Sequence, residues 1–472
     1  MVEPGESKRA ADRPRPILGT GGHVEVLGLH PESRTTPLGP AEGGALSDDL
    51  PDEWWFRPAF FILLPVVGSF LAWFAMVGWR TYGDTPSSWA RLSGFAMPEP
   101  LSVRAAVLIV LWYAAVVSVA SLGFRIGAEA KPAASTVARL STPTFERRYF
   151  AIIMAASVIG VAYSYYKIGS AQSIIGSLTT QSNQFTNSLP GYAGVQTLRS
   201  ATILAAPLSI YLWRKRVVGL TAMVAALVLL LLNSMIASRL SLFMATVVYL
   251  VIWVKTRKPV HDSAVYVRRW IAALALAGVA FGVLTGLNYV RNALYYKDAG
   301  VSNPAVMNLY QMGAYLGVPA QVSIGVADAV MRATWENPGH PVTAANAAVP
   351  TFLQFEKVAK ADGLKDADAY GYAVELEANF TTNSVFADTY AVYGMWGWPY
   401  TLALYAIAGY VFARLIRYGV AVGCTAGVMA HCLSEVWRTQ NVNFGFVIFL
   451  LLLAVFSAVI ADLWCRRDEA RR

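Results

Sequence analysis

The chain has 472 residues, of which 56% are hydrophobic and only 14% are charged, and its mean hydropathy is +0.45. Since soluble domains carry about 25% charged residues, this composition excludes an ordinary soluble protein and indicates an integral membrane protein. The net charge of +9 is compatible with nucleic acid or anionic lipid, but its distribution along the chain favours membrane topology, so we expect no nucleic-acid partner.

Residues 1–52 form a polar stretch that is rich in Gly, Pro and charge and has no apolar core. The stretch is too polar for a signal peptide and predicts a disordered cytoplasmic tail. We therefore expect the first apolar segment after it to act as an uncleaved signal anchor.

Ten apolar segments follow, and a helix needs about 20 apolar residues to cross a bilayer. They are residues 57–79, 102–124, 149–168, 198–213, 217–235, 241–254, 270–289, 397–416, 419–434 and 445–464. The fifth and sixth are separated only by residues 236–240, and one helix of that length would be far longer than a bilayer is thick, so we predict two spans and a tight turn. The pattern predicts an all-α polytopic membrane protein with about ten transmembrane helices.

Lys and Arg concentrate in alternate joints between these segments. The basic joints are residues 125–148, 214–216, 255–269, 414–417 and 466–472, whereas residues 169–196 are almost uncharged. Under the positive-inside rule the basic joints and both termini are cytoplasmic. Residues 53–289 then hold the first seven helices, residues 290–396 form one large outer loop, and residues 397–465 hold the last three helices.

Cys424, Cys432 and Cys465 lie in the ninth predicted span and at the cytoplasmic end of the tenth. Because none lies in the outer loop, we expect no disulfide there.

The predicted outer loop contains no apolar run of membrane length, and we interpret it as a cover over a membrane-embedded site. Residues 303–331 are mildly amphipathic and predict one or two helices broken at Gly317 and Pro319. Residues 370–398 mix aromatic side chains with Asn, Thr and carboxylates. This mixture suits carbohydrate, because rings stack on sugar C–H groups and amides bind hydroxyls, but it also suits any water–bilayer interface.

Three arginines lie at the outer ends of predicted spans. Arg239 occupies the turn between the fifth and sixth spans, Arg291 follows the seventh, and Arg199 is the only charge in the outer stretch 169–199. Two interpretations of Arg239 stay open: its side chain snorkels to lipid phosphate, or it faces an internal cavity and holds a diphosphate or carboxylate.

His431, Glu435 and Arg438 are spaced by four and three residues at the end of the ninth span, which places them on one helical face. Glu435 and Arg438 form an ordinary capping ion pair, or they line an outer cavity in which His431 or Glu435 moves a proton. Trp437 beside them either stacks on a sugar or marks the interface.

Glycan transfer from a lipid diphosphate needs a base for the acceptor hydroxyl and cations for the departing diphosphate. The candidate catalytic carboxylates are Glu375, Glu377, Asp388 and Glu435. The candidate groups that bind the diphosphate or the glycan are Arg199, Arg239, Arg291, Arg438, His340 and His431.

Three stretches carry a family resemblance. They are Ser238-Arg239 with the apolar run to Trp253, the exit at residues 288–291, and Asn383-Ser384-x-x-x-Asp388-x-Tyr390-x-x-Tyr393-Gly394-x-x-Gly397. Together they resemble the bacterial oligosaccharide repeat-unit polymerases, the O-antigen or Wzy-type family, over roughly residues 145–464 of this chain.

The resemblance implies a GT-C-like helical glycosyltransferase of the bacterial plasma membrane that uses neither metal nor cofactor. Such enzymes move a growing glycan from undecaprenyl diphosphate onto the next lipid-linked repeat unit at the outer face. Arg239 and Arg291 match the motif positions best. The implied partners are lipid-linked glycan, membrane lipids, a chain-length regulator and a flippase.

Three other functions are alternatives to the polymerase. A ligase uses the same donor and differs only in its acceptor. A flippase or transporter needs charges in the middle of several helices, whereas here the ionisable residues gather at outer ends. A phosphopolyprenol-monosaccharide glycosyltransferase would carry an acidic pair in the first outer loop, where Asp84 and Glu99 stand far apart.

Overall fold

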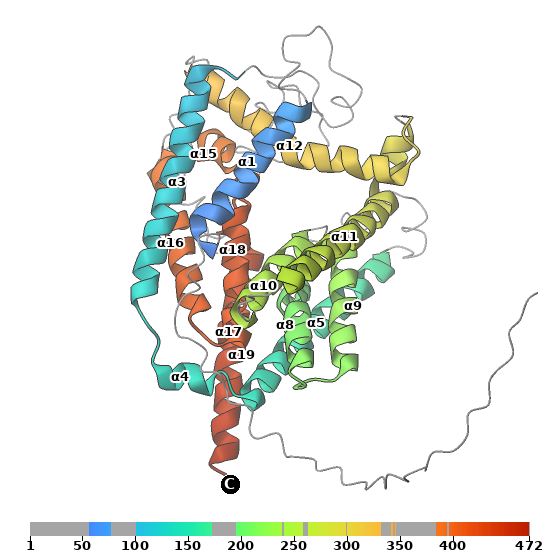
Figure 1. Ribbon diagram of the computed structural model, residues 1–472, viewed down its shortest axis with the longest axis vertical. Coiled ribbons are helices and arrows are strands. Elements are labelled where there is room, and N and C mark those ends of the chain that lie inside the picture. The colour runs from blue at the N-terminus through green and yellow to red at the C-terminus, as the bar shows by residue number, and fades with distance from the viewer. Residues whose placement is uncertain are drawn as a thin grey trace, which may run out of the picture. The chain divides into compact units, whose positions relative to one another are not determined.

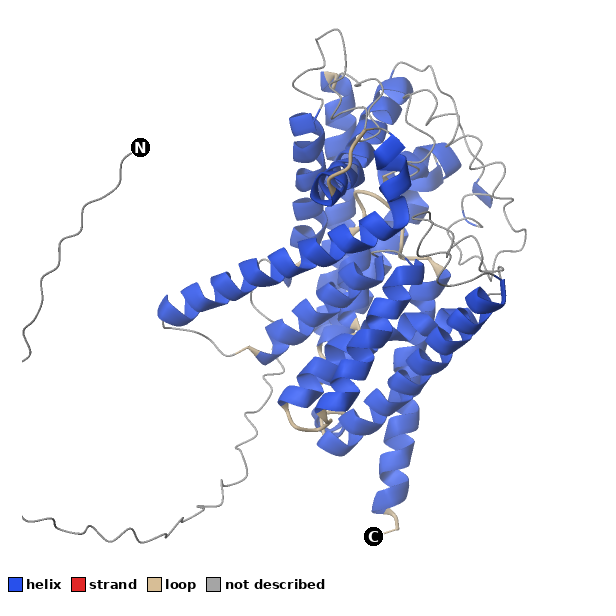
Figure 2. Ribbon diagram, turned by 90° about the vertical axis from the view of Figure 1, so that its right-hand side faces the viewer, coloured by secondary structure: helices blue, strands red, loops and turns tan. Residues whose placement is uncertain are grey.

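In the computed structural model the described residues contain helices and no strand (Figures 1 and 2). These residues are 56–76, 101–171, 195–237, 240–257, 263–298, 300–331, 341–342, 345, 384–393 and 396–471. They all belong to one compact unit, Ser47–Arg472. Six of the described helices are long and apolar enough to cross a membrane, by length and composition. The chain is therefore a helical, multi-pass membrane protein, as predicted.

Each predicted span corresponds to a helix or to a pair of consecutive helices. In chain order these are α1 (Pro58–Met76), α3 (Val103–Glu129), α5 (Pro143–Ala171), η3 (Val195–Ala201) with α8 (Thr202–Arg214), α9 (Leu220–Ala237), α10 (Leu240–Thr256), α11 (Ser263–Asp298), α16 (Gly397–Ile416), α17 (Val420–Gly423) with α18 (Ala426–Ser434), and α19 (Gly445–Glu469). The short α4 (Ala134–Arg139) lies on the first basic joint. The fifth and sixth spans are two separate helices that pack on each other, as predicted.

One helix contradicts the prediction for the loop. Helix α12 (Pro304–Met331) is continuous through Gly317 and Pro319, and it is one of the six helices that are long and apolar enough to cross a membrane. Of the residues in its apolar span 67% are buried, against 33–39% in the other five helices. The expectation of broken, mildly amphipathic helices without a membrane-length run is therefore wrong.

The physical reason is the packing of α12 against α1 and α3. Ser69 Oγ of α1 donates a hydrogen bond of 2.6 Å to the carbonyl of Leu316, which lies within the turn that Pro319 disturbs. Trp73 Nε1 donates to Gln321 Oε1 at 2.6 Å. A neighbouring helix thus packs and hydrogen-bonds on both sides of the proline, and such contacts are one way in which membrane helices tolerate proline.

Helices α3 and α16 lie side by side (Figure 1) and approach closely enough that only glycine fits between them. A Cβ atom at Gly123 would lie 1.9 Å from the carbonyl oxygen of Ala406, and one at Gly409 would lie 2.0 Å from that of Ala120. Small residues at such crossings let backbones meet where lipid provides no hydrophobic driving force.

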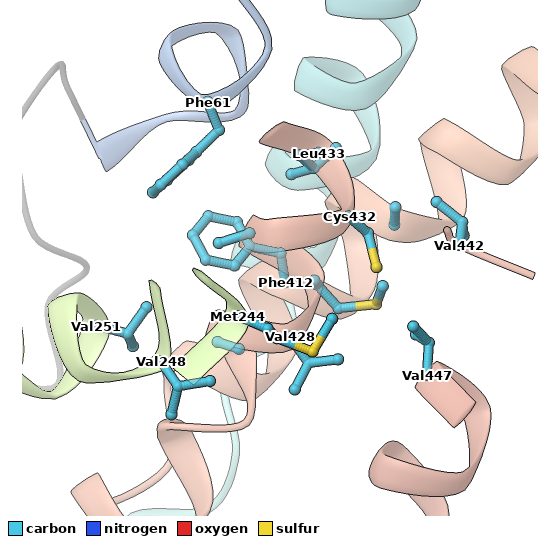
Figure 3. Packing of buried hydrophobic residues seen from close by; sticks show 14 of the residues in the cluster. Phe61, Met244, Val248, Val251, Phe412, Val428, Cys432, Leu433, Val442 and Val447 are labelled. Atoms are coloured by element: carbon cyan, nitrogen blue, oxygen red, sulfur yellow. The ribbon is translucent and has the colours of Figure 1, made fainter. Parts of the chain in front are cut away.

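Helix α18 is buried among α1, α10 and α16. Gly427 permits its approach to α10, since a Cβ atom there would lie 2.4 Å from Val248 Cα. Figure 3 shows side chains of this core from several elements: Phe61, Met244, Val248, Val251, Phe412, Val428, Cys432, Leu433, Val442 and Val447. The core therefore holds α18 in a fixed position between its neighbouring helices.

The basic joints meet at one end of this unit, where their cations bind helix carbonyls and carboxylates. Arg414 and Arg417 donate to the carbonyls of Ala130 and Ala128 at the end of α3. Lys255 donates to the carbonyl of Tyr418 at 2.7 Å and also to that of Ile416. The C-terminal ends of helices attract cations in this way.

Ion pairs tie α19 to the same end of the unit. Arg139 Nε lies 2.8 Å from Asp462 Oδ1, and Arg148 pairs with Asp468. We call this region the basic end. Its cations include Arg139, Arg148, Lys255, Arg414 and Arg417.

Replacement of Gly409 by Ala tests the crossing of α3 and α16. Because the new methyl group meets backbone, we expect Gly409→Ala to lower the free energy of unfolding by about 1–3 kcal/mol, measured as a lower thermal midpoint of the purified protein in detergent. Gly282→Ala on α11 is the matched control, since no atom lies within 4 Å of its Cβ position. Equal midpoints for the two variants would contradict the packing.

Candidate functional site

The clearest gathering of polar side chains lies at the end of α18, away from the basic end. Helix α10 links the two regions: Lys255 at its last turn binds the carbonyl of Tyr418 at the basic end, and Phe243 in its first turn stacks on Tyr315 of α12 at 6.3 Å. Tyr315 in turn contacts the residues that follow α18.

The chain makes a tight turn when α18 ends. Glu435 is the C-cap residue, and its carbonyl accepts hydrogen bonds of 2.8 Å from the backbone N–H groups of both Arg438 and Thr439. Phe444 N–H then donates to the carbonyl of Asn441 at 3.1 Å, directly before α19 begins. We call residues 435–444 the α18–α19 connection. Its shape is set by these backbone bonds.

An ion pair stands at the start of this connection. Arg438 Nε donates to Glu435 Oε2 at 2.8 Å, and only 12% of the arginine side chain and 8% of the glutamate side chain are exposed. The guanidinium carbon lies 4.3 Å from the ring centre of Tyr315, a cation–π contact. The ring of Trp437 meets the same Tyr315 ring edge-on at 5.7 Å.

His431 lies on the other side of Glu435. Its Nε2 is 4.0 Å from Glu435 Oε1, and only 1% of its side chain is exposed. This nitrogen has no hydrogen-bond partner among the described residues. The three side chains lie together as predicted, with the carboxylate between an imidazole and a guanidinium, but they do not share one helical face, because α18 ends at Ser434 and Arg438 lies in the turn that follows. Such an arrangement can hold an anion and can accept a proton.

Sequence reasoning missed two residues in the same connection. Gln440 and Asn441 are 5% and 1% exposed. Both side-chain polar atoms of Gln440 and the Nδ2 of Asn441 lack a hydrogen-bond partner among the described residues. A buried amide left in this state costs about 1–3 kcal/mol. The signal in the sequence is a polar run, Gln-Asn-Val-Asn, between two apolar spans.

Arg199 lies on η3, which packs between α5 and α19. The approach to α5 is close, since a Cβ atom at Gly160 would lie 2.0 Å from the backbone nitrogen of Arg199. The Nη1 of Arg199 is buried and has no hydrogen-bond partner in the described part of the chain. Arg199 therefore keeps donors that an anion can use.

A polar network joins this region to the start of α10. Thr202 Oγ1 donates to the carbonyl of Arg199 at 2.8 Å. Asn233 Nδ2 donates to Thr202 Oγ1 at 3.0 Å and to Ser241 Oγ at 3.2 Å. Ser241 comes two residues after Arg239, so Asn233 connects the segments that carry two of the predicted arginines.

Several predicted site residues lie outside the part of the chain that the structure describes. They are Arg239, His340, Glu375 and Glu377. Arg291 lies on α11, but its side chain is also outside the described part. Asp388 lies, half-buried, in the first turn of α15 (Val385–Tyr393), whose first residue donates from its N–H to the carbonyl of Val436 at 3.3 Å.

No group of three or more His, Cys, Asp or Glu side chains gathers as metal ligands would within the described ranges. Comparisons of the chain with protein-family models, with curated proteins and with solved structures give no match. The resemblance to repeat-unit polymerases therefore stays a prediction from its motifs.

The contact between Arg438 and Tyr315 generates a testable stability difference. We expect Tyr315→Leu to unfold at lower temperature than Tyr315→Phe, because only the second keeps a ring under the guanidinium, a contact worth about 0.5–2 kcal/mol. In an Arg438→Met background this difference should shrink by about 1 kcal/mol. The measurement is a double-mutant cycle on thermal or denaturant unfolding, and an unchanged difference would show that the ring supports α12 alone.

Proposed function

We propose that this chain is a glycosyltransferase of the bacterial plasma membrane that polymerises undecaprenyl-diphosphate-linked oligosaccharide repeat units at the outer face. One observation carries the proposal: Glu435 is held between His431 and Arg438 in a nearly buried cluster at the end of α18. The reaction needs at least a carboxylate that accepts the hydroxyl proton and a guanidinium that stabilises the departing diphosphate.

The chemistry assigns each group a role. The acceptor hydroxyl oxygen attacks the anomeric carbon of the donor sugar, the bond from that carbon to the diphosphate oxygen breaks, and the hydroxyl proton passes to Glu435, with His431 as its neighbour. The diphosphate leaves with the bonding electron pair. Arg438 contacts Glu435 through Nε, and a guanidinium has five N–H donors. The proposal assigns its Nη1 and Nη2 donors to diphosphate oxygens.

The other arginines complete the anion site. Arg199 offers a buried Nη1 donor, and Arg239 and Arg291 are the motif arginines of the family resemblance. Asn233 binds Thr202, whose hydroxyl donates to the carbonyl of Arg199, and Ser241 at the start of α10. Glu375, Glu377 and Asp388 are further carboxylates that the proposal assigns to the acceptor side.

Deletion of the gene tests the class of reaction through the glycans that accumulate. A polymerase defect leaves single repeat units on the lipid at the outer face, which is the expected result. Full-length polymer on the lipid would instead identify a ligase, and units trapped on the inner leaflet would identify a flippase. Either of those two profiles would overturn the proposal.

Substitution of the arginines tests the anion site. We expect Arg438→Gln, Arg239→Ala and Arg291→Ala each to reduce polymer at least about 100-fold, because each removes a cation from the developing diphosphate charge. Protein level should stay normal on immunoblots. Arg466→Ala is the matched control, since its half-exposed side chain pairs with Asp462 at the basic end, and it should keep full polymer. A variant with normal polymer removes its arginine from the site.

Cysteine labelling tests which end faces outward. The three native cysteines are buried, whereas Phe444 at the α18–α19 connection is 42% exposed. We expect a membrane-impermeant maleimide to label Phe444→Cys in intact spheroplasts and to label Arg466→Cys only after the membrane is opened. The reverse pattern would place the proposed site in the cytoplasm.

A further inference from the structure

The side-chain amides of Gln440 and Asn441 are not needed to form the turn of the α18–α19 connection. The backbone bonds to the carbonyl of Glu435, together with the one from Phe444 N–H to the carbonyl of Asn441, already make the α18–α19 connection. The side-chain Nε2 and Oε1 of Gln440 and the Nδ2 of Asn441 are buried without a hydrogen-bond partner among the described residues. Buried amides without a partner in the protein can bind a water molecule or a ligand.

The position of these amides relates them to the proposed reaction. Gln440 follows Arg438 by two residues, and Asn441 by three, in a connection that turns on the carbonyl of Glu435. Phe444, at the end of the connection, is 42% exposed at the protein surface. A ligand bound by the two amides would therefore occupy the same short connection that carries Arg438 of the ion pair.

The hydrogen-bond donors and acceptors of the two amides indicate which kind of ligand they can bind. Gln440 presents one acceptor and two donors, and Asn441 presents donors. A sugar hydroxyl both donates and accepts, so neighbouring hydroxyls can satisfy both sides of the Gln440 amide. A diphosphate or carboxylate only accepts and would meet the lone pairs of Oε1. An alkyl chain would leave all three atoms unpartnered.

We propose that the α18–α19 connection is a binding site for a neutral, hydroxyl-bearing sugar, in which Gln440 donates to and accepts from hydroxyls and Asn441 donates to them. The inference rests on the proposed function, since the sugar it holds is the one at the newly formed bond. The inference adds a determinant of sugar specificity to the proposed function. Arginines bind the diphosphate, and the amides of Gln440 and Asn441 select the sugar.

Binding of simple probes tests the site with the full-length protein in detergent or nanodiscs. The probes are a panel of neutral methyl glycosides and inorganic diphosphate, each measured by isothermal titration or by saturation-transfer NMR. We expect Gln440→Met and Asn441→Leu each to weaken binding of the preferred glycoside about tenfold and to leave diphosphate binding unchanged. Arg438→Gln should show the opposite pattern.

Thermal stability separates a binding role from a structural one. If the amides serve the ligand, their replacement by apolar side chains of similar size keeps or raises the thermal midpoint of the sugar-free protein, because unpartnered buried polar groups are removed. A marked fall in the midpoint, with glycoside binding lost, shows that the amides support the fold and overturns the proposal. Unchanged glycoside binding in both variants, or no glycoside binding by the parent protein, also overturns it.

The outcomes distinguish this site from the proposed function. Extension of lipid-linked repeat units without any effect of Gln440→Met or Asn441→Leu on glycoside binding or on acceptor choice refutes the sugar site alone. Amide-dependent glycoside binding by a protein that extends no lipid-linked unit supports the sugar site and refutes the polymerase.

Discussion

The constraint on which this structure depends is that polar groups inside a membrane protein must find partners within the protein. At the basic end, Lys255, Arg414 and Arg417 bind the carbonyls of helix C-termini, so their charge stabilises the fold. Buried polar atoms without a hydrogen-bond partner among the described residues occur at both ends, on Arg148 at the basic end and on His431, Gln440 and Asn441 at the end of α18. What distinguishes the end of α18 is the carboxylate of Glu435 between His431 and Arg438. The functional interpretation follows from that arrangement.

Helix α12 forms one wall of the cluster of His431, Glu435 and Arg438. It is the most buried of the six apolar, membrane-length helices, and its Tyr315 lies between Phe243 of α10 and the guanidinium of Arg438. The first part of the predicted outer loop is therefore integral to the helical core. A change in the position of α12 would alter the surroundings of Arg438 directly, which couples the packing of α1, α3 and α12 to the ion pair of Arg438 and Glu435.

The helices were predictable because membrane spans are coded by long apolar runs that need no knowledge of neighbours. The ion pair was also predictable, since Glu435 and Arg438 are only three residues apart, although the pair forms in the turn after α18 and not on a helical face. Helix α12 was missed because Gly317 and Pro319 commonly interrupt a helix, whereas here α12 packs against α1 and α3, which are far away in the sequence. Gln440 and Asn441 were missed because burial of a polar loop residue depends on tertiary packing. The spacing of residues in the sequence does not show whether Arg199, Arg239 and Arg291 lie close together in space.

Extension of a lipid-linked substrate by the purified protein tests the central claim most directly. The protein is reconstituted in nanodiscs with synthetic undecaprenyl-diphosphate-linked repeat units, and the products are resolved by mass. We expect a series of products that differ by whole repeat units, with loss of the series in Arg438→Gln. Absence of any extension with every repeat unit tried, together with movement of the same lipid-linked units across vesicle membranes, would contradict it and identify a transporter.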